Sequence, residues 1–179
     1  LKRVGLTEFT FSRFLVPWLC DYRGPAIFMD ADIVVTGDIG ELADQLVPAC
    51  AVQVMQGQAK FEWASVMLFN CDNCAILTPE FVADESHNPL ALGWGNVGKL
   101  TAEWNHCVGY AEPKPAKLYH YTQGIPYWHE SRGLPEDVYW DAEFKELTRT
   151  VEWKELMGKS VHARPVLTRL MRGYGIQVD

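Results

Sequence analysis

Asp30 and Asp32, two aspartates one residue apart, have the types and spacing that best suit chemistry in this sequence. They lie between the apolar runs 26–29 and 33–35, so two buried strand-like segments flank the acidic triplet. In an extended chain, residues i and i+2 point to the same side, so the two carboxylates can converge. Like charges at such a spacing repel each other unless a cation lies between them. A divalent cation with oxygen ligands, Mn²⁺ or Mg²⁺, meets this need and can bridge to a phosphate.

The triplet also fits a solvated turn, because aspartate is common in turns. A loop enclosed by apolar segments on both sides has little reason to carry two charges, and this favours the metal site.

A lone CxxC motif, Cys71 and Cys74, is a second pattern with potential chemistry. A structural zinc site needs a second pair of ligands, and the candidates Cys107, His87 and His106 are scattered along the chain. The odd total of 5 cysteines is typical of free thiols in a reducing compartment. We therefore favour ordinary thiols and a cytoplasmic location. The N-terminal residues do not have the pattern of a signal peptide. No apolar run reaches the roughly 20 residues that a membrane span needs.

The elements that position these residues alternate between helices and strands. Apolar residues recur every three or four positions over 8–20, which predicts a helix that Pro17 kinks or ends early. Further helices are expected over 41–46, 79–83 (with Thr78 as N-cap) and 136–158, and strands over 26–29, 33–35, 50–55, 66–69 and 117–121. Loops and short elements are expected over 88–117, and a basic tail over 162–175 ends the chain. This alternation predicts an α/β fold.

Composition narrows the class of protein. The 179 residues, 48% of them hydrophobic, are enough for one core without disulfides or a metal. The 23 acidic residues outnumber the 16 basic ones and give a net charge of −7, which argues against a nucleic-acid partner. A small anionic substrate could still bind through local groups or a metal ion.

The segment FSRFLVPWLCDYRGPAIFMDADIVVTGDIGEL, residues 11–42, resembles the core of GT-A-fold nucleotide-sugar glycosyltransferases, particularly those similar to family 8. Three more stretches follow in the family's order: WASVMLFNC (63–71), LTAEWNHCVGY (100–110) and LYHYTQGIPYW (118–128). The likeness covers roughly residues 8–130. It implies a GT-A-like (Rossmann-like) mixed sheet flanked by helices in a single domain.

The resemblance implies a metal site formed by Asp30, Asp32 and His120. Mn²⁺ accepts such a mixed oxygen and imidazole set more readily than Mg²⁺. Taken alone, His120 fits a core histidine between Tyr119 and Tyr121 better. The donor-binding residues that the resemblance implies are Arg13, Asp30, Ala31, Asp32, Trp63, Ser65 and Gly124.

The implied activity is metal-dependent transfer of a sugar from a UDP-linked donor to a carbohydrate or other hydroxyl acceptor. Similarity to family 8 implies retention at the anomeric carbon. An inverting enzyme would need a carboxylate base, for which Glu62, Asp84 and Glu103 are available. The sequence selects none of them, so the catalytic residue is unassigned.

The chain departs from the family in three places. Trp63-Ala64-Ser65 replaces the usual Asn-Ala-Gly, which leaves the sugar open. The lysine expected before Pro-Trp is missing, with Lys114 and Lys117 as substitutes. Only 29 residues precede Asp30, so over 1–179 we expect one GT-A-like domain that lacks much of the nucleotide-binding N-terminal βα unit. Weak nucleotide affinity would follow. The open sheet edge could be covered by a second copy in a homodimer.

Two other function classes stay open at this point. One is a catalytically impaired nucleotide-sugar or carbohydrate-binding module with a GT-A-like fold, which the short front of the chain favours. The other is a metal-dependent phosphohydrolase or nucleotidyltransferase. It trails because the chain has no phosphate-cradling glycine-rich loop or further acidic cluster.

Overall fold

The computed structural model describes residues 10–57, 60–126, 131–152, 155 and 158–159. The chain divides into two compact units. One comprises Leu1–His106 with Lys114–Tyr119, and the other Cys107–Pro113 with His120–Asp179. In the described part of the chain, no helix is both long and apolar enough to cross a bilayer.

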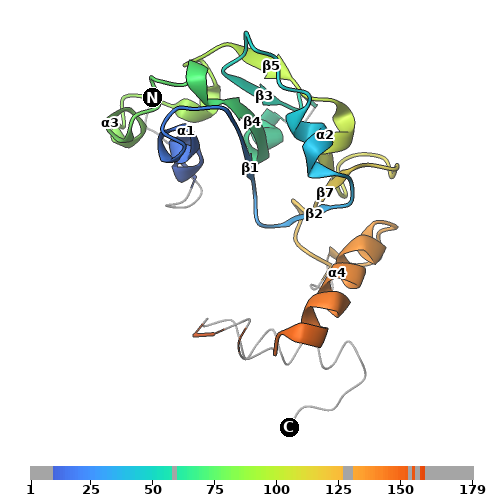
Figure 1. Cartoon of the computed structure of the whole chain (residues 1–179). Helices are drawn as coiled ribbons and strands as arrows, with labels where there is room; N and C mark the ends of the chain where they lie inside the picture. Colours follow the sequence, from blue (N-terminus) through green and yellow to red (C-terminus); the bar gives the residue numbers. More distant parts are fainter. Residues whose placement is uncertain (1–9, 58–59, 127–130, 153–154, 156–157, 160–179) are drawn as a thin grey trace. The chain divides into compact units, whose positions relative to one another are not determined.

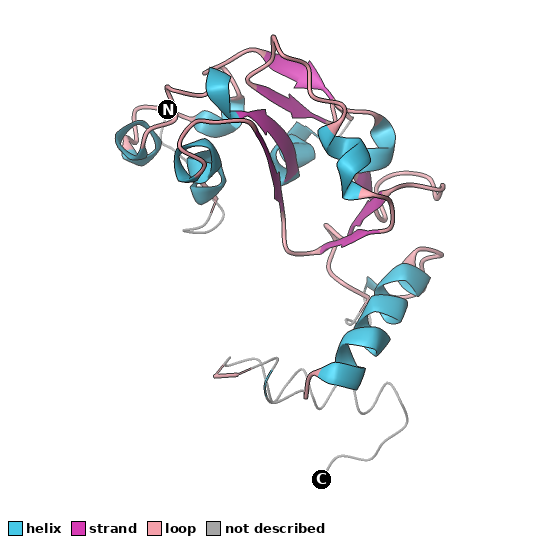
Figure 2. Ribbon diagram, in the orientation of Figure 1, coloured by secondary structure: helices cyan, strands magenta, loops and turns pink. Residues whose placement is uncertain are grey.

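A four-stranded mixed sheet forms the centre of the first unit (Figures 1 and 2). Its strands lie in the order β1 (Pro25–Met29), β4 (Val66–Asn70), β3 (Val52–Val54) and β5 (Val97–Lys99). β4 runs antiparallel to both β1 and β3, whereas β3 and β5 are parallel. The predicted mixed sheet is therefore confirmed.

A second, three-stranded sheet has the order β2 (Ile33–Val35), β7 (Leu118–His120) and β6 (His106–Cys107). Residues 30–32 join β1 of the larger sheet to β2 of the smaller one. The expectation of two buried flanking strands was only partly right. β1 is half-buried because it lies at an edge of its sheet, and in β2 only Val34 is buried.

Three of the helices in the described residues are short: α1 (Val16–Leu19), α2 (Ile39–Ala43) and α3 (Pro79–Ala83). A longer helix of 14 residues, α4, covers Asp137–Thr150. Short 3₁₀ helices cover Ser12–Leu15, Lys60–Ser65, Cys71–Asn73, Pro89–Ala91 and Ala102–Trp104. The predicted helix 79–83 and its Thr78 cap are confirmed, because the Thr78 side chain accepts a hydrogen bond from the Phe81 N–H.

Two helix predictions need correction. The helix expected over 8–20 is a 3₁₀ turn followed by α1, and Pro17 lies in the first turn of α1, where its missing N–H costs no hydrogen bond. The helix expected over 136–158 is α4, which ends at Thr150 because Val151 is extended; residues 153–154 and 156–157 of the expected range lie outside the described residues. Residues 8–9, the motif residues Tyr127 and Trp128, and the basic tail over 162–175 lie outside the described residues.

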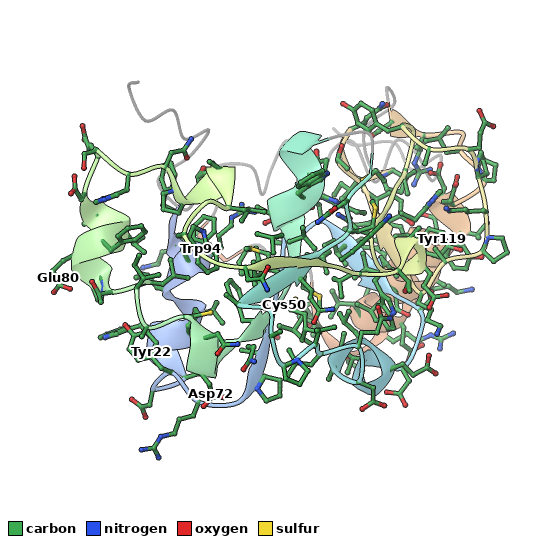
Figure 3. All side chains as sticks on the ribbon, turned by 90° about the horizontal axis from the view of Figure 1, so that it is seen from above. Tyr22, Cys50, Asp72, Glu80, Trp94 and Tyr119 are labelled. Carbon is green, nitrogen blue, oxygen red and sulfur yellow. The ribbon has the colours of Figure 1, made fainter. Side chains whose placement is uncertain are left out.

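Two hydrophobic cores pack against opposite faces of β4. Met67 and Phe69 belong to one core, and Val66 and Leu68 to the other, as the two-residue period of a strand requires. The first core includes Phe14 from the 3₁₀ turn before α1, Val82 of α3 and, packed against it, Trp94, labelled in Figure 3. The second includes Leu42 of α2, Trp104 and Leu118. β4 is therefore buried on both faces and fixes the segments at its two ends.

In the second unit, the segment after β7 packs on the start of α4. The Tyr121 hydroxyl donates to the Glu136 carbonyl at 2.7 Å, and the Tyr121 and Trp140 rings meet edge to face at 5.6 Å. α4 itself has no buried residue.

Candidate metal and donor site

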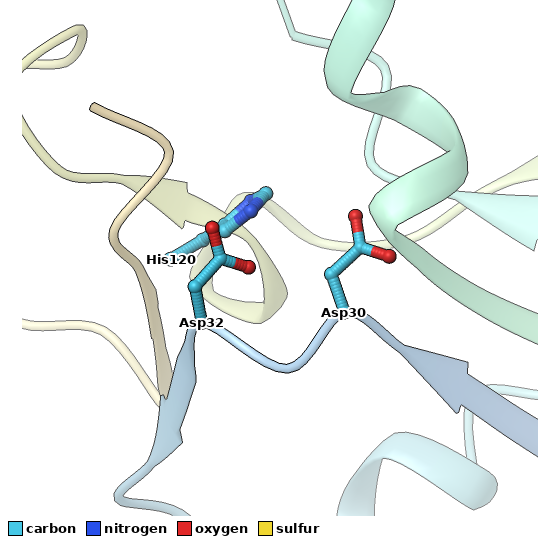
Figure 4. Close-up of side chains that lie close together, drawn as sticks. All are labelled: Asp30, Asp32 and His120. Atoms are coloured by element: carbon cyan, nitrogen blue, oxygen red, sulfur yellow. The ribbon is translucent and has the colours of Figure 1, made fainter. Parts of the chain in front are cut away.

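The two aspartates and the late histidine come together (Figure 4). One ligand atom each from Asp30, Asp32 and His120 lies within 4.8 Å of the others. Asp30 and Asp32 belong to the link between β1 and β2, and His120 is the last residue of β7. The aspartates are half-buried and His120 is buried. Two carboxylates and one imidazole at this spacing are a donor set that fits a divalent cation such as Mn²⁺.

Arg13 fixes the first carboxylate. Its Nη2 lies 3.2 Å from Asp30 Oδ1, and Nη1 donates to the Ala64 carbonyl at 2.6 Å. Nε donates to the Thr10 carbonyl at 2.9 Å, and the guanidinium lies 4.9 Å from the centre of the Phe28 ring. Arg13, which the resemblance implies is a donor-binding residue, therefore lies beside Asp30 and also holds two backbone carbonyls of the chain.

The turn before β4 contacts Asp30 and holds the buried side chain of Ser65. The Ser65 carbonyl accepts the backbone N–H of Asp30 at 2.9 Å. The Ser65 hydroxyl is buried, donates to the Glu62 carbonyl and accepts from Asn105 Nδ2 at 3.2 Å. Asn105 Nδ2 also donates to the Glu62 carbonyl at 3.1 Å. The sequence singled out Ser65 as a pocket residue, and its hydroxyl lies within this internal network.

The other predicted donor-binding residues have diverse surroundings. The Trp63 indole donates to the Gly57 carbonyl at 3.1 Å, and its ring packs partly against the first core. Ala31 is exposed between the two aspartates. Gly124 has a φ of +105° and donates its N–H to the Tyr121 carbonyl, so it closes the turn after His120. A left-handed φ of this kind favours glycine at that position.

The two substitute lysines differ. Lys117 forms ion pairs with Glu41 and with Glu103, the latter at 3.1 Å, and its ammonium lies 5.6 Å from the centre of the Trp104 ring. Hydrogen bonds from the ammonium to the two carboxylates raise the pKa of Lys117. Lys117 therefore clamps the start of β7 to α2 and to the 102–104 turn, while Lys114 is exposed.

Two of the three carboxylates considered as a base form ion pairs, and the third residue, Glu62, takes part in the site through its backbone carbonyl. Glu103 pairs with Lys117, and Asp84 pairs with His87 at 3.2 Å on the surface. The Glu62 carbonyl caps the Ser65 and Asn105 side chains.

The cysteines have the character of structural thiols. All five are free, and Cys71 and Cys74 are fully buried. Burial raises the pKa of each of these two thiols to about 12, with a smaller contribution from Cys20 at Cys71. Among the described residues, neither belongs to a group of three metal-ligating side chains.

The sequence and the fold were compared with those of known proteins. No family model matches the sequence. Protein CDI of Arabidopsis thaliana is 31% identical over 170 residues, covering 79% of this chain and 62% of that protein. The chain thus spans less than two thirds of the length of this curated relative.

Several solved glycosyltransferases share the architecture. The galactosyltransferase LgtC, in complex with donor and acceptor sugar analogs, aligns with a TM-score of 0.54 at 15% identity over 82% of this chain and 68% of that one. GlyE of Streptococcus pneumoniae TIGR4 aligns with a TM-score of 0.56 at 17% identity over 82% of this chain and 47% of that one. The bifunctional glycosyltransferase WbbM aligns with a TM-score of 0.53 at 15% identity, covering 94% and 38%. The chain therefore has the GT-A glycosyltransferase fold that its motifs resemble.

Proposed function

We propose that this chain is a metal-dependent glycosyltransferase domain that moves a sugar from a UDP-linked donor to a hydroxyl acceptor such as a carbohydrate. The observation that carries the proposal is the convergence of Asp30, Asp32 and His120 within a GT-A fold. A turn that carried the two aspartates only for solubility would have no reason to meet a buried histidine from a strand more than 80 residues later.

The proposed cofactor is Mn²⁺, or Mg²⁺, held by Asp30, Asp32 and His120. A bound divalent cation would supply charge neutralisation for the diphosphate leaving group. Arg13 keeps Asp30 oriented and adds positive charge on the same side of the group. We place the donor against Arg13, Ala31, Trp63, Ser65 and Gly124 together with the two aspartates, with Ser65 acting through the shape of its turn.

In the retaining reaction that similarity to family 8 implies, the bond from the anomeric carbon to the diphosphate oxygen breaks. The acceptor oxygen bonds to the same face of that carbon, and the acceptor proton passes to the leaving phosphate. The contribution of the chain is to hold donor and acceptor in reacting geometry, which can supply a large part of the rate enhancement.

The test is calorimetric titration of UDP with and without Mn²⁺, on the wild-type protein and on Asp32→Ala. Asp44→Ala is the matched control, since Asp44 is an exposed aspartate at the end of α2. We expect UDP binding to depend on Mn²⁺ in the wild type and in Asp44→Ala, and to be lost in Asp32→Ala.

Release of UDP from a set of UDP-sugars then separates an enzyme from a binding module. Turnover supports the transferase. Metal-independent UDP binding without turnover supports the alternative of an impaired nucleotide-sugar-binding module. The absence of UDP binding under every condition would refute the donor assignment.

A further inference from the structure

Asn105 is a fully buried polar side chain that makes long-range hydrogen bonds. Its Nδ2 donates to the Glu62 carbonyl at 3.1 Å and to the Ser65 hydroxyl oxygen at 3.2 Å. Burying an amide costs free energy unless its hydrogen bonds are made. The two acceptors lie 40 or more residues earlier, so the amide joins the end of the 102–104 turn to the turn before β4.

The turn that Asn105 holds, before β4, positions Asp30, which is the first of the proposed metal ligands. The Ser65 carbonyl accepts the Asp30 backbone N–H at 2.9 Å, and the Ala64 carbonyl accepts from Arg13, which in turn pairs with the Asp30 carboxylate. Residues 64–65 thus hold the backbone of Asp30 by a direct hydrogen bond and its side chain through Arg13. A shift of that turn would move Asp30.

The neighbours of Asn105 contact the strand that carries the third ligand. Trp104, before it, is fully buried beneath the Lys117 ammonium. His106, after it, meets the Tyr119 ring edge to face at 5.5 Å, and Tyr119 directly precedes His120. Residues 104–106 therefore touch the supports of both Asp30 and His120.

We propose that Asn105 is a positioning residue that sets the spacing between Asp30 and His120, and so the affinity of the site for a divalent cation. This inference rests on the proposed metal site. The chemistry required is one NH₂ group with two donors. An aspartate side chain at this position would have the same shape, but it could only accept, so the Glu62 carbonyl would lose its donor and a buried negative charge would face it.

The test compares Asn105→Asp with Asn73→Asp. Asn73 is the control because its Nδ2 also donates two long-range hydrogen bonds, in this case to the carbonyls of Pro48 at 2.7 Å and Cys50 at 2.9 Å. Mn²⁺ affinity is measured by titration, with free Mn²⁺ followed by its electron paramagnetic resonance signal. Stability is measured by thermal unfolding of the metal-free protein. Since outer partners of metal ligands commonly change metal affinity by about 10–100-fold, we expect Asn105→Asp to weaken Mn²⁺ binding by about 10-fold or more. We expect Asn73→Asp to keep wild-type affinity while losing stability.

Ser65→Ala provides a second variant in case Asn105→Asp does not fold, because it removes one acceptor and leaves no buried charge. We expect a smaller loss of Mn²⁺ affinity in this variant. Wild-type affinity in a folded Asn105→Asp, or in Ser65→Ala where Asn105→Asp does not fold, would overturn the inference and leave the proposed function standing. A wild-type protein that binds no Mn²⁺ would refute the metal site and the inference together.

Discussion

Arg13 Nη2 lies 3.2 Å from Asp30 Oδ1, so the first carboxylate of the proposed metal site is paired with a cation of the chain itself. The other nitrogens of the guanidinium are bonded to the carbonyls of Thr10 and Ala64. A planar fork can satisfy these directions at once, whereas an ammonium on a flexible stem cannot. The shape of the side chain should therefore matter as well as its charge.

We expect Arg13→Lys to lower the free energy of unfolding by about 1–2 kcal/mol, even though the charge is kept, because charge-assisted hydrogen bonds are lost. The measurement is urea unfolding, with the midpoint compared at an unchanged slope. Arg149→Lys is the control, since Arg149 makes an exposed pair with Glu146 and should change stability by about 0.5 kcal/mol or less. Equal stability of Arg13→Lys and wild type would contradict the role of the fork.

The N-cap of α3 gives a second prediction. The Thr78 hydroxyl accepts from the Phe81 N–H at 3.2 Å and also bonds to the Glu80 carboxylate. Thr78→Ala should cost about 1 kcal/mol, and Thr78→Ser should restore most of it. Urea unfolding of the three proteins checks this order.

Glu80 reports on the same cap. Hydrogen bonds from its own backbone N–H and from Thr78 lower the pKa of Glu80 below 4.5. The stabilising contribution of Glu80 is present above that value and is lost as the pH falls through the lowered pKa. In Thr78→Ala the pKa should move back up toward 4.5, which a carboxyl-detected titration by NMR measures. An unchanged Glu80 pKa would mean that Thr78 is not its partner in solution.

Sequence patterns predicted the elements whose signals are local. The apolar run 33–35 is a strand with those bounds, and the Thr78-Pro79 pair marks the start of α3. β5 and β6, of 3 and 2 residues, were missed because neither is a continuous apolar run like that of 33–35 and both depend on partners elsewhere in the chain. Val97–Lys99 contains a glycine and becomes a strand by pairing with β3, a tertiary effect that no local pattern encodes.

The sequence indicated the three candidate metal ligands but not the contacts that hold them. The spacing of Asp30 and Asp32 indicated a cation, and the family motif added His120. The pairing of Arg13 with Asp30 and the link from Asn105 to Ser65 were not predicted, because hydrogen bonds between distant segments leave no periodicity in the sequence. The only available signal for Asn105 was the Trp-Asn pair of the family motif.

The buried thiols give a prediction about reactivity. With pKa values of about 12, Cys71 and Cys74 remain protonated in the folded protein at neutral and mildly alkaline pH. The thiolate is the reactive form, so both should resist iodoacetamide at about pH 8.5 in the native state and react in urea. Peptide mass mapping identifies the modified positions. Rapid native labelling of Cys74 would contradict this account.

The same thiols make stability depend on alkaline pH. In the unfolded chain they ionise near their ordinary pKa of 9.0, while in the folded chain they hold their protons to about 12. Stability is therefore fully present below pH 9 and falls as the pH rises toward 12, by roughly 1 kcal/mol per thiol at pH 10. Cys74→Ala should reduce this slope in urea unfolding measured between about pH 8 and pH 10.5, and an unchanged slope would point to other groups.

Gly98 tests the parallel pairing of β3 and β5. It lies opposite Gln53 in the register, and a Cβ added there would be 2.6 Å from Cys50 Sγ and 2.7 Å from Gln53 Cγ. Overpacking of this kind typically costs about 1–3 kcal/mol, so we expect Gly98→Ala to lower the urea midpoint accordingly. Gly93→Ala is the control, because a Cβ there meets no atom within 4 Å.

We expect Cys50→Ala combined with Gly98→Ala to lose less stability than the sum of the two single changes, since removing the sulfur relieves one of the two clashes. Strict additivity would contradict the close approach of Cys50 to Gly98.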